Sequence, residues 1–260
     1  MKTLKFVLVY FVTIGLFAQT QISPLSNFML QDMGKGSWYL KSAYEFKNLN
    51  LNFAYQFSSQ LAIFSGYNYQ NAKYHFNPIL GDMDTNHIQD DGITIGGAYF
   101  FKNDESNFWS KNILLGLDLR KADLKRYDSN NPSFNDHNSY QYNRYFSQLN
   151  VIREKEKLIW VLSGKLSMVE IHNYKSEIPD YENLYEGANI FSFDTSAGVL
   201  VKFYKSENLK LNSQIGISFP LNKLTEIESD GSYTTETTIK YSPSIFMNLG
   251  ISYSFKMNEE

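Results

Sequence analysis

Cysteine is absent from this sequence of 260 residues, and there is no excess of lysine and arginine over the acidic residues. Without cysteine the chain has neither a disulfide framework nor the lipid-modified cysteine that anchors a lipoprotein. The formal net charge is −3, whereas a nucleic-acid partner would favour a basic surface. We therefore expect no disulfides, no lipoprotein anchor and no nucleic-acid partner.

Long apolar runs are also missing beyond the start of the chain. After residue 18 no segment approaches the roughly 20 apolar residues that a membrane helix requires. Residues 1–18 have Lys2 and Lys5 before an apolar run that is too short to span a bilayer, which is typical of a cleaved export signal. We expect residues 1–18 to be a signal peptide and residues 19–36 to be a periplasmic lead-in.

Alternation of apolar and polar residues is the main pattern in the rest of the chain. Between residues 209 and 219, for example, Leu209, Leu211 and Ile215 share one face of an expected strand and polar residues share the other. Aromatic residues make up 16% of the chain, and membrane barrels gather such residues in girdles at both interfaces. Residues 37–260 are therefore predicted to form an all-β, transmembrane, antiparallel up-and-down β-barrel in the outer membrane of a Gram-negative bacterium.

The alternating stretches and the turn residues between them predict about ten strands, with eight or twelve left open. Short connections alternate with long polar ones near 74–91, 123–139, 173–189 and 222–237, and this asymmetry is typical of outer-membrane barrels. The expected strands are 37–46, 49–58, 61–73, 92–103, 108–122, 140–153, 158–172, 190–204, 208–221 and 238–256.

The two faces of the expected strands have different roles. Apolar faces such as Trp38, Leu40 and Tyr44 should meet lipid. Charges of both signs on the opposite faces should lie inside, where about ten strands leave a bore close to filled, and we interpret them as ion pairs in preference to a solute path. The expected interior charges are Lys41, Glu45, Asp118, Arg120, Lys165, Asp194 and Lys202.

An acidic segment from Gly81 to Gly92 carries a partial calcium-loop pattern. Asp82, Asp84 and Asn86 have the one-three-five spacing of oxygen ligands in such a loop. His87 then replaces the glycine at position six, and Ile93 stands where a bidentate glutamate is needed. We favour a solvated loop over a metal site here.

Histidines at one rim of the barrel leave a hydrolase open, because acid–histidine or serine–histidine pairs at that rim would support nucleophilic chemistry. None of the four histidines has a tight motif around it. The first candidates for catalytic residues are His87, Asp82 and Asp84. The four histidines expected near that rim are His75, His87, His137 and His172.

Aromatic residues surround Arg144 in the sequence. Tyr140, Tyr142, Tyr145 and Phe146 would suit a carbohydrate platform. We favour an outer aromatic girdle, with Arg144 reaching lipid headgroups or the barrel interior.

Five segments share a diffuse barrel pattern, namely residues 36–44, 51–57, 61–69, 143–148 and 208–216. They resemble segments of uncharacterised outer-membrane β-barrel proteins of Bacteroidetes-type bacteria. The resemblance covers most of the chain after the signal and rests on barrel patterns, not on a catalytic signature. It implies the fold and the location, and it transfers no functional residue.

A structural or binding barrel, or a narrow passive channel, is the function that these features favour. The alternatives are an outer-membrane rim hydrolase of protease or lipase type and a subunit of an envelope complex. We favour a monomer without enzymatic activity or cofactor, with outer-membrane lipid around it and, for the third alternative, an envelope protein as partner.

Overall fold

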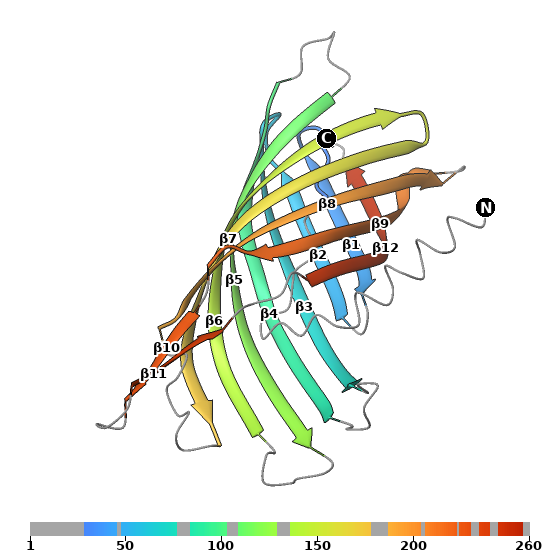
Figure 1. Ribbon diagram of the computed structural model, residues 1–260. Helices are drawn as coiled ribbons and strands as arrows, with labels where there is room; N and C mark the ends of the chain where they lie inside the picture. The colour runs from blue at the N-terminus through green and yellow to red at the C-terminus, as the bar shows by residue number, and fades with distance from the viewer. Residues whose placement is uncertain are drawn as a thin grey trace, which may run out of the picture.

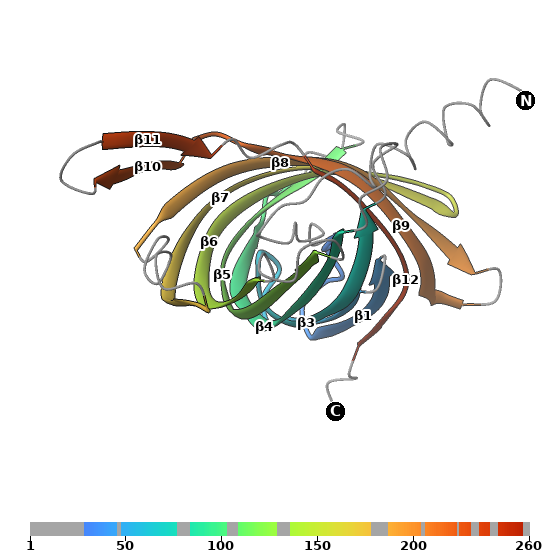
Figure 2. The ribbon, with the colours of Figure 1, turned by 60° about the horizontal axis from the view of Figure 1, so that its bottom comes forward.

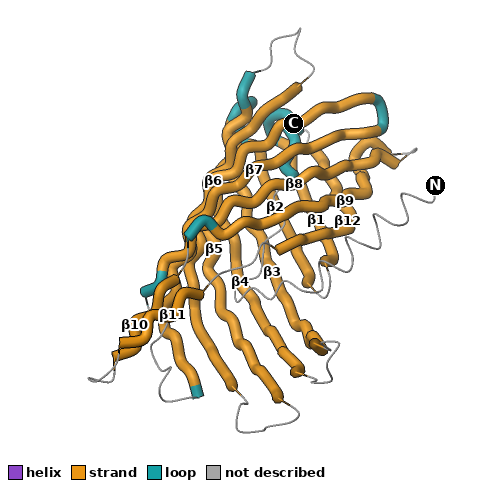
Figure 3. The backbone as a smooth tube through the Cα atoms, in the orientation of Figure 1, coloured by secondary structure: helices purple, strands orange, loops and turns teal. Residues whose placement is uncertain are grey.

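Strands make up nearly all of the described backbone (Figure 3). The computed structural model describes residues 29–45, 48–76, 84–102, 109–128, 136–177, 187–203, 206–222, 224–229, 234–239 and 244–256. No helix in these ranges is long and apolar enough to cross a membrane.

Ten of the strands form one closed antiparallel barrel, which confirms the predicted fold class and strand number (Figure 1). The ring is closed where β1 (Ser37–Glu45) pairs with β12 (Ser244–Lys256). The strands between them are β2 (Asn48–Gln56), β3 (Leu61–Phe76), β4 (Asp84–Phe100), β5 (Trp109–Asp128), β6 (Asp136–Lys155), β7 (Leu158–Ser176), β8 (Asn189–Phe203) and β9 (Ser206–Pro220).

A two-stranded hairpin interrupts the barrel order between β9 and β12. Its strands, β10 (Leu224–Ser229) and β11 (Thr234–Ile239), pair only with each other in the described part of the chain. Figure 2 shows this hairpin outside the ring of barrel strands. The sequence prediction placed residues 222–237 in a loop and was wrong here, because the chain forms a separate ribbon.

The barrel has two different ends. At the short-turn end the connections are brief, as in the turn at residues 156–157 between β6 and β7. At the long-loop end, strands β3 to β7 run beyond the predicted boundaries, so that residues 84–91, 123–128 and 136–139 are strand and not loop. The sequence prediction of long loops was therefore wrong in extent.

A reversal of the alternation explains that error. In the half of β5 nearer the short-turn end, the outward residues Leu115 and Leu119 are apolar and exposed, and the inward Asp118 is buried. Closer to the long-loop end, the inward Ala122 is apolar and the outward Lys121 is charged. Because the apolar face changes side, a search for continuous alternation ends the strand too early.

An apolar belt covers the outer wall on the short-turn side of that reversal. Its side chains alternate with buried inward ones along each strand, as expected for a barrel. At the seam that closes the barrel, Trp38 of β1 stacks on Tyr55 of β2 at 4.3 Å and on Phe255 of β12 at 6.5 Å between ring centroids. The most exposed members of the belt are Tyr44, Leu115, Leu249, Leu166, Ile63, Ile93, Trp160, Leu162 and Ile251.

Candidate functional site: the filled lumen and the outer rim

The lumen, meaning the space enclosed by the ten strands, is lined by buried side chains of unlike chemistry at different heights. An apolar layer lies at the short-turn end, a polar and charged layer lies in the middle, and an aromatic layer lies towards the long-loop end. Inward residues of all three layers, such as Phe64, Lys165 and Tyr142, are less than 9% exposed. Within the described residues, the lumen is therefore lined by closely packed side chains that leave no wide bore.

Residues Met29–Met33, just before β1, lie inside the short-turn end. Met29 and Leu30 are each 1% exposed. Leu30 belongs to a buried cluster with inward residues of β1 to β6, and Met29 to a second cluster with β6, β7 and β8. The sequence analysis expects a periplasmic lead-in over residues 19–36, and the described part of that range, residues 29–36, includes the buried Met29 and Leu30.

The barrel wall is shaped to fit this segment. Gly198 faces Met29, and a Cβ atom at that position would stand 2.3 Å from the Met29 sulfur. Any larger residue at position 198 would therefore collide with Met29 unless the methionine moved. The absence of a side chain at Gly198 makes room for the inserted methionine.

Side chains of the wall hold the polar groups of the segment. The amide of Gln56 in β2 accepts a hydrogen bond from the Met33 backbone at 2.9 Å and donates one to the Asp32 carboxylate at 2.7 Å. Gln31 donates to Glu154 at 2.7 Å and accepts from Lys210 at 3.0 Å. Glu154 is in turn paired with Lys202.

A line of amides connects the segment to the polar middle of the lumen. The Asn112 amide donates to the Leu30 carbonyl at 2.7 Å, and Asn150 donates to Asn112 at 2.8 Å. Gln148 and Ser163 both donate to the Asn150 carbonyl oxygen, each at 2.7 Å. These buried amides satisfy one another and the segment, which removes most of the cost of taking them from water.

An ionic cluster fills the lumen between the amides and the long-loop end. The Asp90 carboxylate accepts hydrogen bonds from Arg120 and from the Tyr142 hydroxyl, both at 2.8 Å. The guanidinium groups of Arg120 and Arg144 lie 6.0 and 5.7 Å from the centre of the Tyr142 ring. Neither carboxylate oxygen of Asp118 has a hydrogen-bond partner among the described residues, but Asp118 stands opposite Arg144 in the β5–β6 register.

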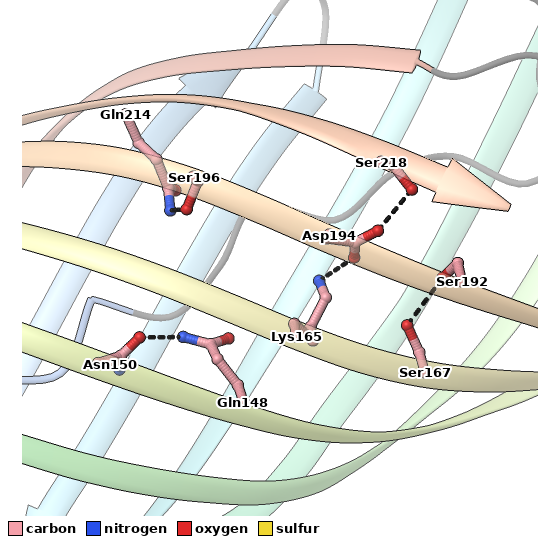
Figure 4. A network of polar contacts seen from close by, with 9 residues as sticks. All are labelled: Gln148, Asn150, Lys165, Ser167, Ser192, Asp194, Ser196, Gln214 and Ser218. Atoms are coloured by element: carbon pink, nitrogen blue, oxygen red, sulfur yellow. Dashed lines mark hydrogen bonds and ion pairs between the residues drawn. The ribbon is translucent and has the colours of Figure 1, made fainter. Parts of the chain in front are cut away.

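A second ion pair lies on the neighbouring wall. Lys165 of β7 meets Asp194 of β8 at 3.0 Å, and both side chains are 3% exposed. Figure 4 shows Lys165 and Ser218 reaching Asp194 from the two strands beside it. Because both charges are buried and paired, this contact ties β7, β8 and β9 together.

The structure accounts for most of the charges expected inside. Lys41, Asp118, Arg120, Lys165 and Asp194 are inward-facing and at most 6% exposed. Lys202 is partly exposed at the short-turn end, and the side chain of Glu45 lies outside the described residues. Arg144 also points into the lumen at 3% exposure, together with Tyr140, Tyr142 and Phe146, so no carbohydrate platform is formed there.

At the long-loop end, His137 of β6 lies between two carboxylates. Its Nε2 is 3.0 Å from Asp123 of β5, and its Nδ1 is 2.9 Å from Glu177 just after β7. Carboxylates only accept hydrogen bonds, so both ring nitrogens act as donors and the imidazolium form is favoured. The bond to Asp123 and then the bond to Glu177 raise the pKa of His137 above its ordinary value, while burial and Lys125 oppose the shift.

Among the other proposed catalytic and metal residues, His87 alone has a side chain that the structure describes. His87 lies in β4, where its Nε2 meets the Asn71 carbonyl oxygen at 2.9 Å. Asp84 and Asn86 lie in the same strand, and their side chains, like the whole of Asp82, fall outside the described residues. A strand is not the coiled loop on which a calcium site of this spacing depends.

The two remaining histidines are His172, whose contacts the structure describes, and His75. His172 accepts from the Asn143 amide at 3.0 Å and lies 3.7 Å from Glu170. His75 is in β3, and its side chain is not described. Among the described residues no group of three His, Asp or Glu side chains is arranged to hold a metal ion.

Sequence reasoning missed the inserted segment and the His137 cluster. The available signal for the first was the consecutive apolar run Phe28, Met29 and Leu30 in the expected periplasmic lead-in. The second had no local sequence signal, because Asp123 and His137 stand at opposite ends of one expected loop, 123–139, and Glu177 lies in another, 173–189. Only the paired strands β5, β6 and β7 bring them together.

Matches to this chain are found among solved structures. No protein family model and no curated protein matches this chain. Solved structures that match include the translocator domain of the autotransporter NalP from Neisseria meningitidis, with 10% identity, a TM-score of 0.44, and coverage of 84% of this chain and 86% of that one.

Two further matches extend over nearly the whole of the matched chains. CarO from Acinetobacter baumannii has 10% identity and a TM-score of 0.34, and covers 87% of this chain and all of its own (100%). The outer-membrane protein AlkL, solved in lipid bilayers, has 15% identity and a TM-score of 0.36, with coverage of 92% and 99%. At these values the matches carry no functional argument.

Proposed function

We propose that this chain is a monomeric outer-membrane barrel of a Gram-negative bacterium that is closed at rest and serves as a structural or binding protein at the cell surface. The exposed apolar belt supports the membrane setting, because large exposed apolar patches are rare on soluble proteins. The short turns would face the periplasm and the long-loop end the outside, as in outer-membrane barrels.

The observation that carries the closed state is the occupied short-turn end. Met29 and Leu30 are buried there among inward residues from several strands. Next to them, towards the long-loop end, lie the amides and ion pairs. Inward side chains of this layer, such as Gln148, Lys165 and Asn212, are at most 2% exposed. A solute would have to displace both layers to pass, so a general porin role is disfavoured.

Planar bilayer recording tests the closed state. The purified, folded protein should give no conductance steps, while a general porin in the same bilayer gives them. Regular steps from the unmodified chain would overturn the proposal. Cell fractionation and a heat-dependent shift in gel mobility test the membrane setting separately, and a soluble, heat-insensitive protein would contradict it.

A hydrolase at the rim is less well supported. A general base needs a free ring nitrogen within reach of the reacting proton, and carboxylates occupy both nitrogens of His137. His172 is bonded to an amide instead of a nucleophile. The rim histidines described here are thus better suited to holding strands together.

Membership of an envelope complex is the second candidate, and the β10–β11 hairpin favours it. The hairpin pairs with no barrel strand in the described part of the chain, and isolated two-stranded ribbons are rarely stable alone. A partner strand could add to its edge by backbone hydrogen bonds. Affinity purification in mild detergent should then recover a protein that is lost when residues 224–239 are replaced by a short linker; a clean monomer in both cases would exclude this role.

A further inference from the structure

The inserted segment, residues 29–33, is bound by side chains of the barrel wall and forms no strand of that wall. No backbone–backbone hydrogen bond joins Met29–Met33 to a strand in the described part of the chain. Its polar contacts are made instead by side chains of the wall, among them Gln56, Asn112 and Lys210. Side-chain recognition of this kind is specific for the segment but does not need it to be continuous with β1.

The connection to the barrel is a single tight turn. Gly34 and Gly36 both have φ of 81°, a left-handed conformation that glycine adopts without strain, and they flank the exposed Lys35. The Gly36 amide donates to the Gln56 carbonyl at 2.8 Å, which fixes the start of β1 independently of the segment. The segment and the barrel are thus two surfaces joined by a short hinge.

The receiving surface has a defined chemistry. It offers two apolar subsites, one around Leu30 and one around Met29 beneath Gly198. Next to them the Gln31 amide is bonded by Glu154 and Lys210, and the Asp32 carboxylate by Gln56. The surface therefore selects two adjacent apolar residues followed by an amide and a carboxylate.

We propose that the short-turn mouth of the barrel is a peptide-binding site, which Met29–Met33 occupies in cis and which a separate peptide of the same chemistry can occupy in trans. The segment thereby acts as a built-in competitor for that peptide. The inference shares only the closed barrel with the proposed function, and its test in detergent needs no membrane, so the two can fail separately.

The test separates the segment from the barrel after folding. A recognition sequence for a site-specific protease is inserted between Lys35 and Gly36, the chain is folded in detergent, and the hinge is then cut. The N-terminal fragment should stay bound through a gel-filtration column and should be displaced by an excess of a synthetic peptide of residues 26–35. The emptied barrel should bind the fluorescently labelled peptide saturably, with one peptide per barrel.

Matched variants establish which contacts matter. A peptide with Leu30→Asp should bind at least about tenfold more weakly, because a charge would enter an apolar subsite. The barrel variant Gln56→Leu should weaken the binding of the normal peptide, since it loses both bonds to Asp32 and Met33. Heat-dependent gel mobility verifies that this variant is folded.

The outcomes that overturn the proposal are equally definite. If the cut fragment leaves without competitor and the labelled peptide does not bind the emptied barrel, the segment has no binding site of its own. Equal binding of the normal, the Leu30→Asp and a scrambled peptide would also overturn it, because nonspecific adsorption would then explain the signal.

Discussion

The side-chain amide of Asn112 lies 2.7 Å from the backbone carbonyl oxygen of Leu30, although 82 positions separate the two residues in the chain. Leu30 is thereby tied to the start of β5 as well as to the apolar layer around it. The contact makes the N-terminal segment part of the folded core of the barrel.

Replacement of Leu30 by alanine should therefore destabilise the barrel. Leu30 is 1% exposed, and such large-to-small changes in a packed core cost about 2–5 kcal/mol. Urea-dependent folding into lipid vesicles measures the change. Leu40→Ala is the matched control, because Leu40 is 46% exposed on the outer wall, and an equal loss in both variants would contradict the assignment of Leu30 to the core.

Gly198 and Met29 should be energetically coupled. Gly198→Ala places a Cβ 2.3 Å from the Met29 sulfur, so the single variant should lose stability as the methionine is displaced. Met29→Ala empties that space, and the double variant should lose less than the two single losses combined. Additive losses in this double-mutant cycle would show that the two residues do not meet.

Breaking the buried pair of Lys165 and Asp194 should be costly. Both side chains are 3% exposed. Removal of one partner leaves the other charge buried and unpaired, which costs about 3–5 kcal/mol. Lys165→Met tests this in the same folding assay, and Lys165→Met with Asp194→Leu should recover part of the loss. Lys202→Met is the control, because its partner Glu154 is 43% exposed and such pairs contribute about 0–1 kcal/mol.

The strand ends around His137 should loosen as the pH rises. Because the folded protein raises the pKa of His137, the stabilisation is fully present below the ordinary histidine value of about 6.5 and is lost as the pH passes through the elevated value. Hydrogen exchange at the ends of β6 and β7, corrected for the intrinsic effect of pH, should show this loss of protection. His137→Gln should remove the pH dependence, and an unchanged profile would refute it.

Much of the barrel wall was predictable from residue order, because successive side chains of every strand in a closed barrel point alternately outward and inward. Outward Leu40, Leu115 and Trp160 had to be apolar and inward Lys41 and Asp118 polar, and this period of two shows in the sequence. The prediction failed between the apolar belt and the long-loop end, at Ala122 and Lys121. There the outward side chains become polar and the inward ones become apolar.

The sequence by itself thus determined a β-barrel of about ten strands with an apolar belt and charges inside, because a strand with one apolar face has a local pattern with a period of two. Only the tertiary structure decided that Leu30 closes one end and that Asp123, His137 and Glu177 meet at the other. Those contacts join residues that strand pairing brings together, and no local pattern encodes which distant residues the pairing will align.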